Sequence, residues 1–385
     1  MSSAGPAPVE TPASDITELA RDRAIVVCCG SGGVGKTTTA AAIAVEGARL
    51  GRKACVVTID PAKRLADALG LASLTNQPGL VRGDWDPPGE LWALMLDTKS
   101  TFDDLVARYA DGPDQAKGIL TNRLYRNISG ALSGTQEYMA MEKLFELHDD
   151  ARFDLIVVDT PPTRNALDFL DAPRRLTRFL DNRVFRVLMM PTRAYLRAVS
   201  VATQAFLRTV SKVVGSEVVK DAVDFFAAFE GMEQGFRNRA QRVLELLSEP
   251  GTAFVLVAAP RKDAVEEALY FARRLQESSI TIQALVVNRL HPRFGRVPSV
   301  LTSPSAAAQP AAAPLAALLG NLKELVDIAE REEQYFGTLA AQVAPAPVAR
   351  VPFLSDDVHD LHGLTEVGRY LFANDGPVVA SPDSS

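Results

Sequence analysis

Short, mostly apolar runs recur along the chain, separated by segments with helical periodicity. The runs lie at 24–29, 54–59, 91–96, 153–159, 252–259 and 280–287. Continuous apolar runs of this length are typical of strands that are buried on both faces of a sheet. Because helical segments alternate with them, the pattern predicts an α/β fold with a doubly wound, mostly parallel sheet.

Two long segments, about 101–149 and 164–247, have helical patterns without strand signals, and they predict an α-helical subdomain inserted into this core. Residues 297–314 form an Ala/Pro/Ser-rich linker, and a helix is predicted at about 315–343. Residues 1–20 and 374–385 have the composition of disordered tails. The predicted domain therefore spans 21–373.

The first apolar run leads directly into a glycine-rich segment and then a helix. The segment fits the phosphate-binding pattern G-x-x-x-x-G-K-[ST], with candidate nucleotide contacts at Gly30, Ser31, Gly32, Gly33, Val34, Gly35, Lys36, Thr37 and Thr38. We expect Lys36 to reach the β- and γ-phosphates and Thr37 to bind Mg²⁺. A glycine-rich turn that binds nothing is the alternative, but strand, motif and helix together favour a nucleotide site.

Two aspartates end predicted strands at the edge of the sheet where ligands bind in such folds. Asp60 could orient or deprotonate an attacking water, or cap the next helix. Asp159 ends a strand resembling a Walker B element and could hold the Mg²⁺ shell, although an isolated strand-terminal Asp is more often a cap. Asn288 follows a late strand, where its amide could contact a base or form a turn.

The net charge of −6 argues against a general nucleic-acid-binding protein. Residues 174–212 nevertheless contain nine basic residues and one acidic residue, interleaved with apolar side chains. Such helices, within 170–247, suit a hydrophobic client, a protein partner or an anionic membrane surface. An ordinary helical subdomain with solvated arginines is the alternative.

All three cysteines, Cys28, Cys29 and Cys55, fall in apolar runs, which predicts buried, reduced thiols. No signal peptide or membrane-spanning run is recognisable, so we expect a cytoplasmic protein, with peripheral contact to a membrane as a further option.

Together these motifs resemble the ArsA-like ATPases, which comprise the arsenical-pump ATPase and the ATPase that guides tail-anchored membrane proteins. The resemblance spans about 22–373 and is carried by GSGGVGKTTTAAAIA, TIDPAKRLADALG, GTQEYMAMEK and VVDTPPTRNALDFL. The late VVNRL strand and VPFLSDDVHDL support it more weakly. The arrangement is most similar to single-P-loop, anion-transporting-ATPase-like proteins of actinobacterial type, which form paired subunits.

The resemblance implies a Mg²⁺-dependent ATPase that works as a dimer, in which nucleotide opens and closes a helical groove. It implies that Asp60 positions the attacking water, that Asp159 begins switch II, and that Asn288, Pro352 and Phe353 contact adenine. The partner would be a second copy or a second ArsA-like subunit.

Three departures from the family pattern bear on function. Ser31 stands where the family usually carries a signature lysine that reaches the partner's phosphates, which favours a heterodimer in which the other subunit supplies it. The family's zinc-binding and arsenite-binding cysteines are missing, and Arg261 replaces a frequent glutamate. Alternatives to the leading ATPase hypothesis are a regulatory subunit with little activity alone, an arsenite-type anion pump, and a partition-type ATPase.

Overall fold

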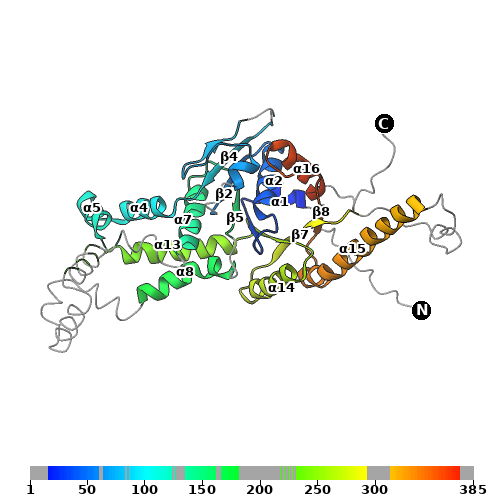
Figure 1. Ribbon diagram of the computed structural model, residues 1–385. Coiled ribbons are helices and arrows are strands. Elements are labelled where there is room, and N and C mark those ends of the chain that lie inside the picture. The colour runs from blue at the N-terminus through cyan, green and yellow to red at the C-terminus, as the bar shows by residue number, and fades with distance from the viewer. Residues whose placement is uncertain are drawn as a thin grey trace, which may run out of the picture.

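The computed structural model describes most of the predicted core and part of the helical region (Figure 1). The described residues are 16–59, 64–82, 85, 87–123, 125, 135–161, 166–181, 217, 221, 225, 228, 231–292 and 313–372.

An eight-stranded sheet forms the centre, with strand order β3-β4-β2-β5-β1-β6-β7-β8. The strands are β1 (Ile25–Cys29), β2 (Lys53–Thr58), β3 (Gly79–Leu80), β4 (Glu90–Met95), β5 (Leu155–Asp159), β6 (Thr252–Ala258), β7 (Ile282–Leu290) and β8 (Val348–Pro352). The neighbouring pairs are parallel, except for the antiparallel pair β3 and β4. β1 lies between β5 and β6, so its carboxyl end opens at the middle of the ligand-binding edge.

Helices cover both faces of this sheet, and the alternation of side chains along β1 shows why each strand is apolar throughout. Val26 and Cys28 pack in one core cluster with residues of α2 (Lys36–Arg49), whereas Ile25, Val27 and Cys29 pack in the other. The first face also carries α1 (Ile16–Asp22), α3 (Arg64–Ala68) and α16 (Leu361–Phe372). The doubly wound α/β fold is therefore confirmed.

The second face is covered by α7 (Thr135–Asp149), α13 (Glu233–Ser248), α14 (Lys262–Glu277) and α15 (Ala313–Val343). Helices α4 (Thr98–Tyr109), α5 (Pro113–Thr121) and α8 (Ala166–Asp181) extend with α13 to one side of the sheet (Figure 1). These helices fall in the two segments predicted to be helical. Most of the basic segment 174–212 lies outside the described residues.

The structure differs from the sequence-based predictions in two respects. The predicted disordered tail is too long, because residues 16–20 belong to α1, where Ile16, Leu19 and Ala20 are buried against the α2 side of the core. The sequence pattern also missed the edge strands β3 and β8. β3 has only two residues, both exposed, and β8 alternates buried and half-buried positions and ends at a proline.

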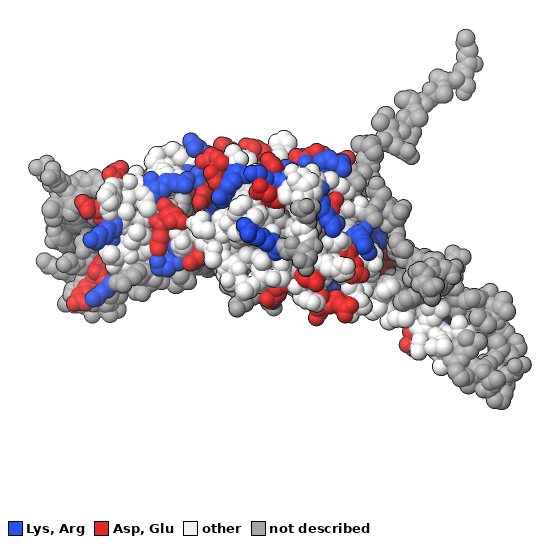
Figure 2. Space-filling model, turned by 90° about the horizontal axis from the view of Figure 1, so that it is seen from above, with Lys and Arg blue, Asp and Glu red and all other residues white. Residues whose placement is uncertain are grey.

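The view in Figure 2 shows the distribution of charge on one face of the molecule. Lysine and arginine side chains lie among aspartates and glutamates, and the described residues there form no large area of one sign. No helix among the described residues is long and apolar enough to cross a membrane.

Candidate functional site

The predicted phosphate loop lies at the carboxyl end of β1, between the ends of β5 and β6. Two glycines are required there by close packing. A Cβ atom on Gly30 would lie 2.1 Å from the Val257 carbonyl oxygen, and one on Gly35 would lie 2.1 Å from Asn288 Nδ2. Gly33 has a φ of +74° and no atom within 4 Å of an added Cβ, so the tip of the loop faces open space. The loop is therefore tightly packed at Gly30 and Gly35 and open at Gly33.

Lys36 begins α2 and its side chain folds back over the loop. It is buried, and its Nζ donates to the Ser31 carbonyl oxygen at 2.8 Å. The amino end of α2 follows directly, so the N–H groups of its first turn and its dipole favour an anion at the same place. The loop carries the charge and donors that a polyphosphate needs.

Two residues of the site, Thr37 and Asp159, carry oxygen atoms that could bind a metal ion. Thr37 Oγ1 donates to Asp159 Oδ2 at 2.8 Å, and Thr58 Oγ1 donates to the same carboxylate oxygen at 2.9 Å. Because β5 lies between β1 and β2, Asp159 pairs in register with both Cys28 and Thr58. A threonine hydroxyl and a carboxylate are hard oxygen ligands, which Mg²⁺ prefers. The donor set fits a magnesium ion completed by nucleotide oxygens and water.

The described residues include no cluster of three His, Cys, Asp or Glu side chains that could hold a metal ion. Thr160, which follows Asp159, donates through Oγ1 to the Cys28 carbonyl oxygen at 2.8 Å and thereby fixes the end of β5 against β1. The metal-binding role predicted for Thr37 and Asp159 stays a prediction.

Lys36, Thr37 and Thr160 line a cavity of about 400 Å³. Its lining combines the phosphate loop with residues of α3, β7 and the loop before α16, namely Gly33, Gly35, Lys36, Thr37, Thr38, Arg64, Asp67, Ala68, Thr160, Arg289 and Val358. A volume of this size suits a small-molecule ligand.

Asn288 lies within β7 rather than after its end, and its amide braces the phosphate loop. Nδ2 donates to the Val34 carbonyl oxygen at 2.9 Å, while Oδ1 accepts from the Arg289 backbone N–H at 2.9 Å. An amide group has two N–H donors and two lone pairs, so one of each is left for a base. The predicted contact between Asn288 and adenine stays a prediction. The hydrogen bond from Asn288 to the Val34 carbonyl oxygen, which stabilises the phosphate loop, is an additional role.

Pro352 and Phe353 lie next to this strand, and their predicted contact with adenine stays a prediction. Pro352 pairs in register with Leu290, and the Phe353 N–H donates to the Leu290 carbonyl oxygen at 2.8 Å. The Phe353 side chain is 54% exposed, and its ring centroid lies 5.8 Å from that of His291. An exposed aromatic ring here could stack on a base.

Of the remaining predicted residues, Asp60 lies outside the described part of the chain. Sequence reasoning assigned no role to Thr58 or Arg289. The signal for Thr58 was a polar residue in an apolar strand, two positions before Asp60. No sequence pattern indicated that Arg289 lines the cavity.

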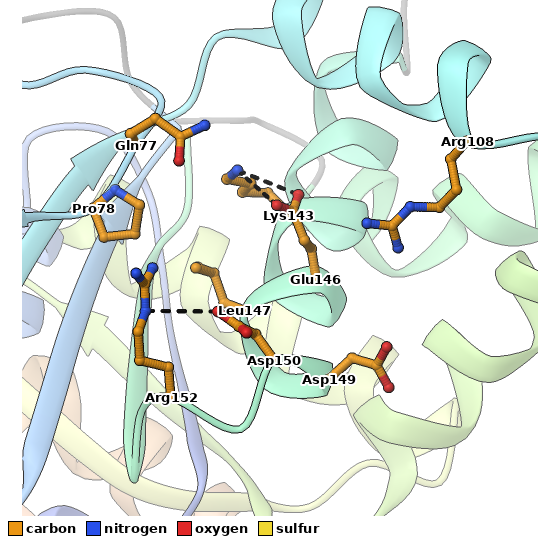
Figure 3. Close-up of a pocket in the computed structure, with 9 residues that line it drawn as sticks. All are labelled: Gln77, Pro78, Arg108, Lys143, Glu146, Leu147, Asp149, Asp150 and Arg152. Atoms are coloured by element: carbon orange, nitrogen blue, oxygen red, sulfur yellow. Dashed lines mark hydrogen bonds and ion pairs between the residues drawn. The ribbon is translucent and has the colours of Figure 1, made fainter.

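A second cavity of about 400 Å³ lies away from the phosphate loop, between the loop at Gln77, the end of α4 and the carboxyl half of α7 (Figure 3). Its charges are of both signs and partly paired. Lys143 Nζ lies 3.2 Å from Glu146 Oε2, and Arg152 Nε lies 3.6 Å from Asp150 Oδ2. With cations and carboxylates paired in this way, the second cavity is a weaker candidate than the phosphate-loop cavity.

Comparison with known proteins identifies the family. The model of the anion-transporting ATPase family matches residues 23–296. ATPase GET3B of Arabidopsis thaliana is 28% identical over 283 residues, which cover 68% of this chain and 63% of that protein. ATPase get3 of Aspergillus terreus is 30% identical over 152 residues, covering 39% of this chain and 43% of the relative.

An ATPase ASNA1 homolog of Babesia bovis is 32% identical over 171 residues, which cover 44% of each chain. The aligned segments thus span less than two thirds of the length of each of these three relatives. The family match covers the phosphate loop, both strands that place Thr58 and Asp159, and β7 with Asn288 and Arg289. The chain belongs to the anion-transporting ATPase (ArsA) family.

Proposed function

We propose that this protein is a Mg²⁺-dependent ATP hydrolase. The observation that carries the proposal is that Lys36 and Thr37 line one cavity and that the Thr37 hydroxyl lies 2.8 Å from the buried Asp159 carboxylate. The names of the three relatives, each called an ATPase, support the same activity.

We assign a separate role to each residue of the site. Lys36 and the N–H groups at the start of α2 stabilise negative charge on the β- and γ-phosphates. Thr37 and Asp159 hold Mg²⁺, which when bound neutralises phosphate charge. Thr58 keeps the Asp159 carboxylate oriented. Asp60 aligns the attacking water, and Asn288, Pro352 and Phe353 contact the base.

We further propose a cytoplasmic dimer whose open and closed states are set by nucleotide. Helices α8 and α13, which pack against each other, belong to the basic and apolar region 170–247 that would handle a hydrophobic or membrane-protein segment.

A second candidate function is that of a nucleotide-binding subunit of a heterodimer, with little activity alone. Ser31 favours this candidate, because a serine has no positive charge to offer a partner's phosphates. An arsenite-type pump is less well supported, because all three cysteines are buried.

Steady-state ATPase activity of the full chain tests the proposal. We expect Lys36→Ala to abolish ATP binding or turnover. Asp60→Asn should retain binding and lower turnover at least about tenfold, which corresponds to about 1.4 kcal/mol of transition-state stabilisation. Asp263→Asn, an isosteric change at an exposed position of α14, is the matched control. Unchanged turnover in the Asp60 variant would remove the role assigned to that residue.

A further inference from the structure

Arg289 has an unusual backbone conformation for its place in the fold. Three non-glycine residues in the described chain have positive φ values: Ala151, Ser279 and Arg289. Ala151 and Ser279 lie just after α7 and α14, where left-handed residues commonly end helices. Arg289, with a φ of 63°, lies inside strand β7 instead. Its conformation therefore needs another explanation.

The cause is a β-bulge. Asn288 pairs with Val351 and Leu290 pairs with Pro352, so Arg289 is an extra residue without a partner in the ladder. Bulges next to functional sites redirect side chains, and strained backbone persists where the surrounding structure holds it for a purpose. The bulge turns two consecutive side chains, those of Asn288 and Arg289, toward the phosphate loop.

The guanidinium group of Arg289 lies at the rim of the phosphate-loop cavity. One of its terminal nitrogens donates to the Gly33 carbonyl oxygen at 3.1 Å, at the open tip of the loop. The residue is exposed and lines the same cavity as Lys36 and Thr37. One hydrogen bond to a carbonyl uses one of the five N–H donors of an arginine, so donors remain for an anion.

We propose that Arg289 contacts the phosphate chain of the bound nucleotide and supplies, from within this chain, positive charge that Ser31 does not. The inference rests on the proposed function and deepens it, because it names a further residue that binds the phosphate chain and so favours nucleoside di- and triphosphates over monophosphates. A guanidinium presents a planar pair of N–H donors that matches phosphate oxygens, and such charge-assisted bonds are stronger than neutral ones.

The test measures dissociation constants of the full chain for MgADP and for AMP by isothermal titration calorimetry. The variants are Arg289→Gln, Arg289→Lys and Arg289→Gly. Arg331→Gln is the matched control, because Arg331 is also exposed and donates to a single backbone carbonyl, that of Asp327, at 3.1 Å. Thermal unfolding of each variant checks the fold, and Arg289→Gly keeps the left-handed backbone without strain.

We expect Arg289→Gln and Arg289→Gly to weaken MgADP binding at least fivefold and AMP binding clearly less, with Arg289→Lys recovering part of the loss and Arg331→Gln equal to wild type. Equal weakening for both nucleotides would mean that Arg289 only braces Gly33, and the proposal would be wrong. Unchanged MgADP affinity would also overturn it. If the wild-type protein binds no MgADP, the proposed function is wrong. If the wild-type protein binds MgADP and the Arg289 variants bind it equally well, the inference about Arg289 is wrong and the proposed function stands.

Discussion

At the scale of single residues, most of the site is explained by steric fit and by paired polar atoms. Gly30 and Gly35 have no room for a side chain, since their Cβ atoms would meet Val257 and Asn288. Burial also determines the chemistry of the cysteines. It raises the pKa of Cys55 from 9.0 to about 12 and raises the pKa values of Cys28 and Cys29 as well. These thiols are therefore neutral and unreactive in the folded protein at physiological pH.

This burial predicts a loss of stability in alkaline solution. Below pH 9 the Cys55 thiol is neutral in the folded and the unfolded chain. Between pH 9 and about 12 the unfolded chain releases the proton and the folded chain keeps it. The unfolded state then binds fewer protons, so the free energy of unfolding falls, by about 1.4 kcal/mol per pH unit for this one group.

Urea unfolding at several pH values above 9, comparing wild type with Cys55→Ala, measures this contribution. The variant should show a shallower decline, by about 1.4 kcal/mol per pH unit, whatever its stability at pH 7. Parallel declines in the two proteins would contradict a buried, protonated Cys55.

At the scale of elements, α7 and α13 are joined by a buried polar network. Arg239 Nε donates to Glu142 Oε2 at 2.8 Å, and Tyr138 donates to the other oxygen of the same carboxylate. The side chains of Arg239 and Glu142 are only 5% and 1% exposed, and the guanidinium also stacks 3.8 Å from the centre of the Phe145 ring. Burial raises the pKa of Glu142, while Arg239 opposes that rise. This charge pair thus adds to the apolar packing that joins α13 to α7.

Removing one member of this pair should be costly. Arg239→Met leaves the Glu142 carboxylate buried without its cation, and we expect the free energy of unfolding to fall by about 3–5 kcal/mol. The double variant Glu142→Gln with Arg239→Met should lose less. Arg237→Met on the same helix is the control, because its ion pair with Asp181 is 31% and 42% exposed and should contribute less than about 1 kcal/mol.

Denaturant unfolding of wild type, Arg239→Met, Glu142→Gln, the double variant and the Arg237→Met control gives the comparison. A double variant that is as unstable as the sum of its single variants would show that the charges act independently, contrary to this account.

At the scale of the whole molecule, the phosphate loop and the helical region are connected through the sheet. The loop lies at the carboxyl end of β1, and α7 and α13 pack on the face of the same sheet. A change at the nucleotide site could therefore reach α13, one of the two helices that we propose hold a client. Whether two chains cooperate in one catalytic cycle is a property of the assembly, and under the proposed heterodimer it depends on position 31.

Ser31→Lys tests that dependence. If the isolated chain normally receives a lysine from a different subunit, wild type should hydrolyse ATP slowly, and the variant should gain at least about tenfold in turnover with a shift toward dimer in ATP. Light scattering with and without ATP, together with ATPase assays, gives both quantities. A wild-type homodimer with brisk turnover would instead show that Ser31 is tolerated and would exclude the regulatory-subunit alternative.

The sequence by itself determined the features that depend on local pattern. Continuous apolar runs predicted β1, β2, β4, β5, β6 and β7, because a strand covered on both faces must be apolar at every position. The motif from Gly30 to Thr37 predicted a loop followed by a helix, and the structure has both, since glycines and the lysine must occupy fixed positions around a phosphate. The apolar run before Asp159 likewise predicted that this residue ends a strand.

Only the tertiary structure decided the features that depend on neighbours distant in sequence. β3 and β8 are strands because they pair with β4 and β7, and their own residues give little signal. Residues 16–20 are helical because Ile16 and Leu19 find a core to pack against. Arg289 reaches the phosphate loop because a bulge in the β7–β8 ladder turns it there. Such contacts join residues that are 14 positions apart in Gly79 and Ala93 and 256 positions apart in Gly33 and Arg289, and no local pattern encodes them.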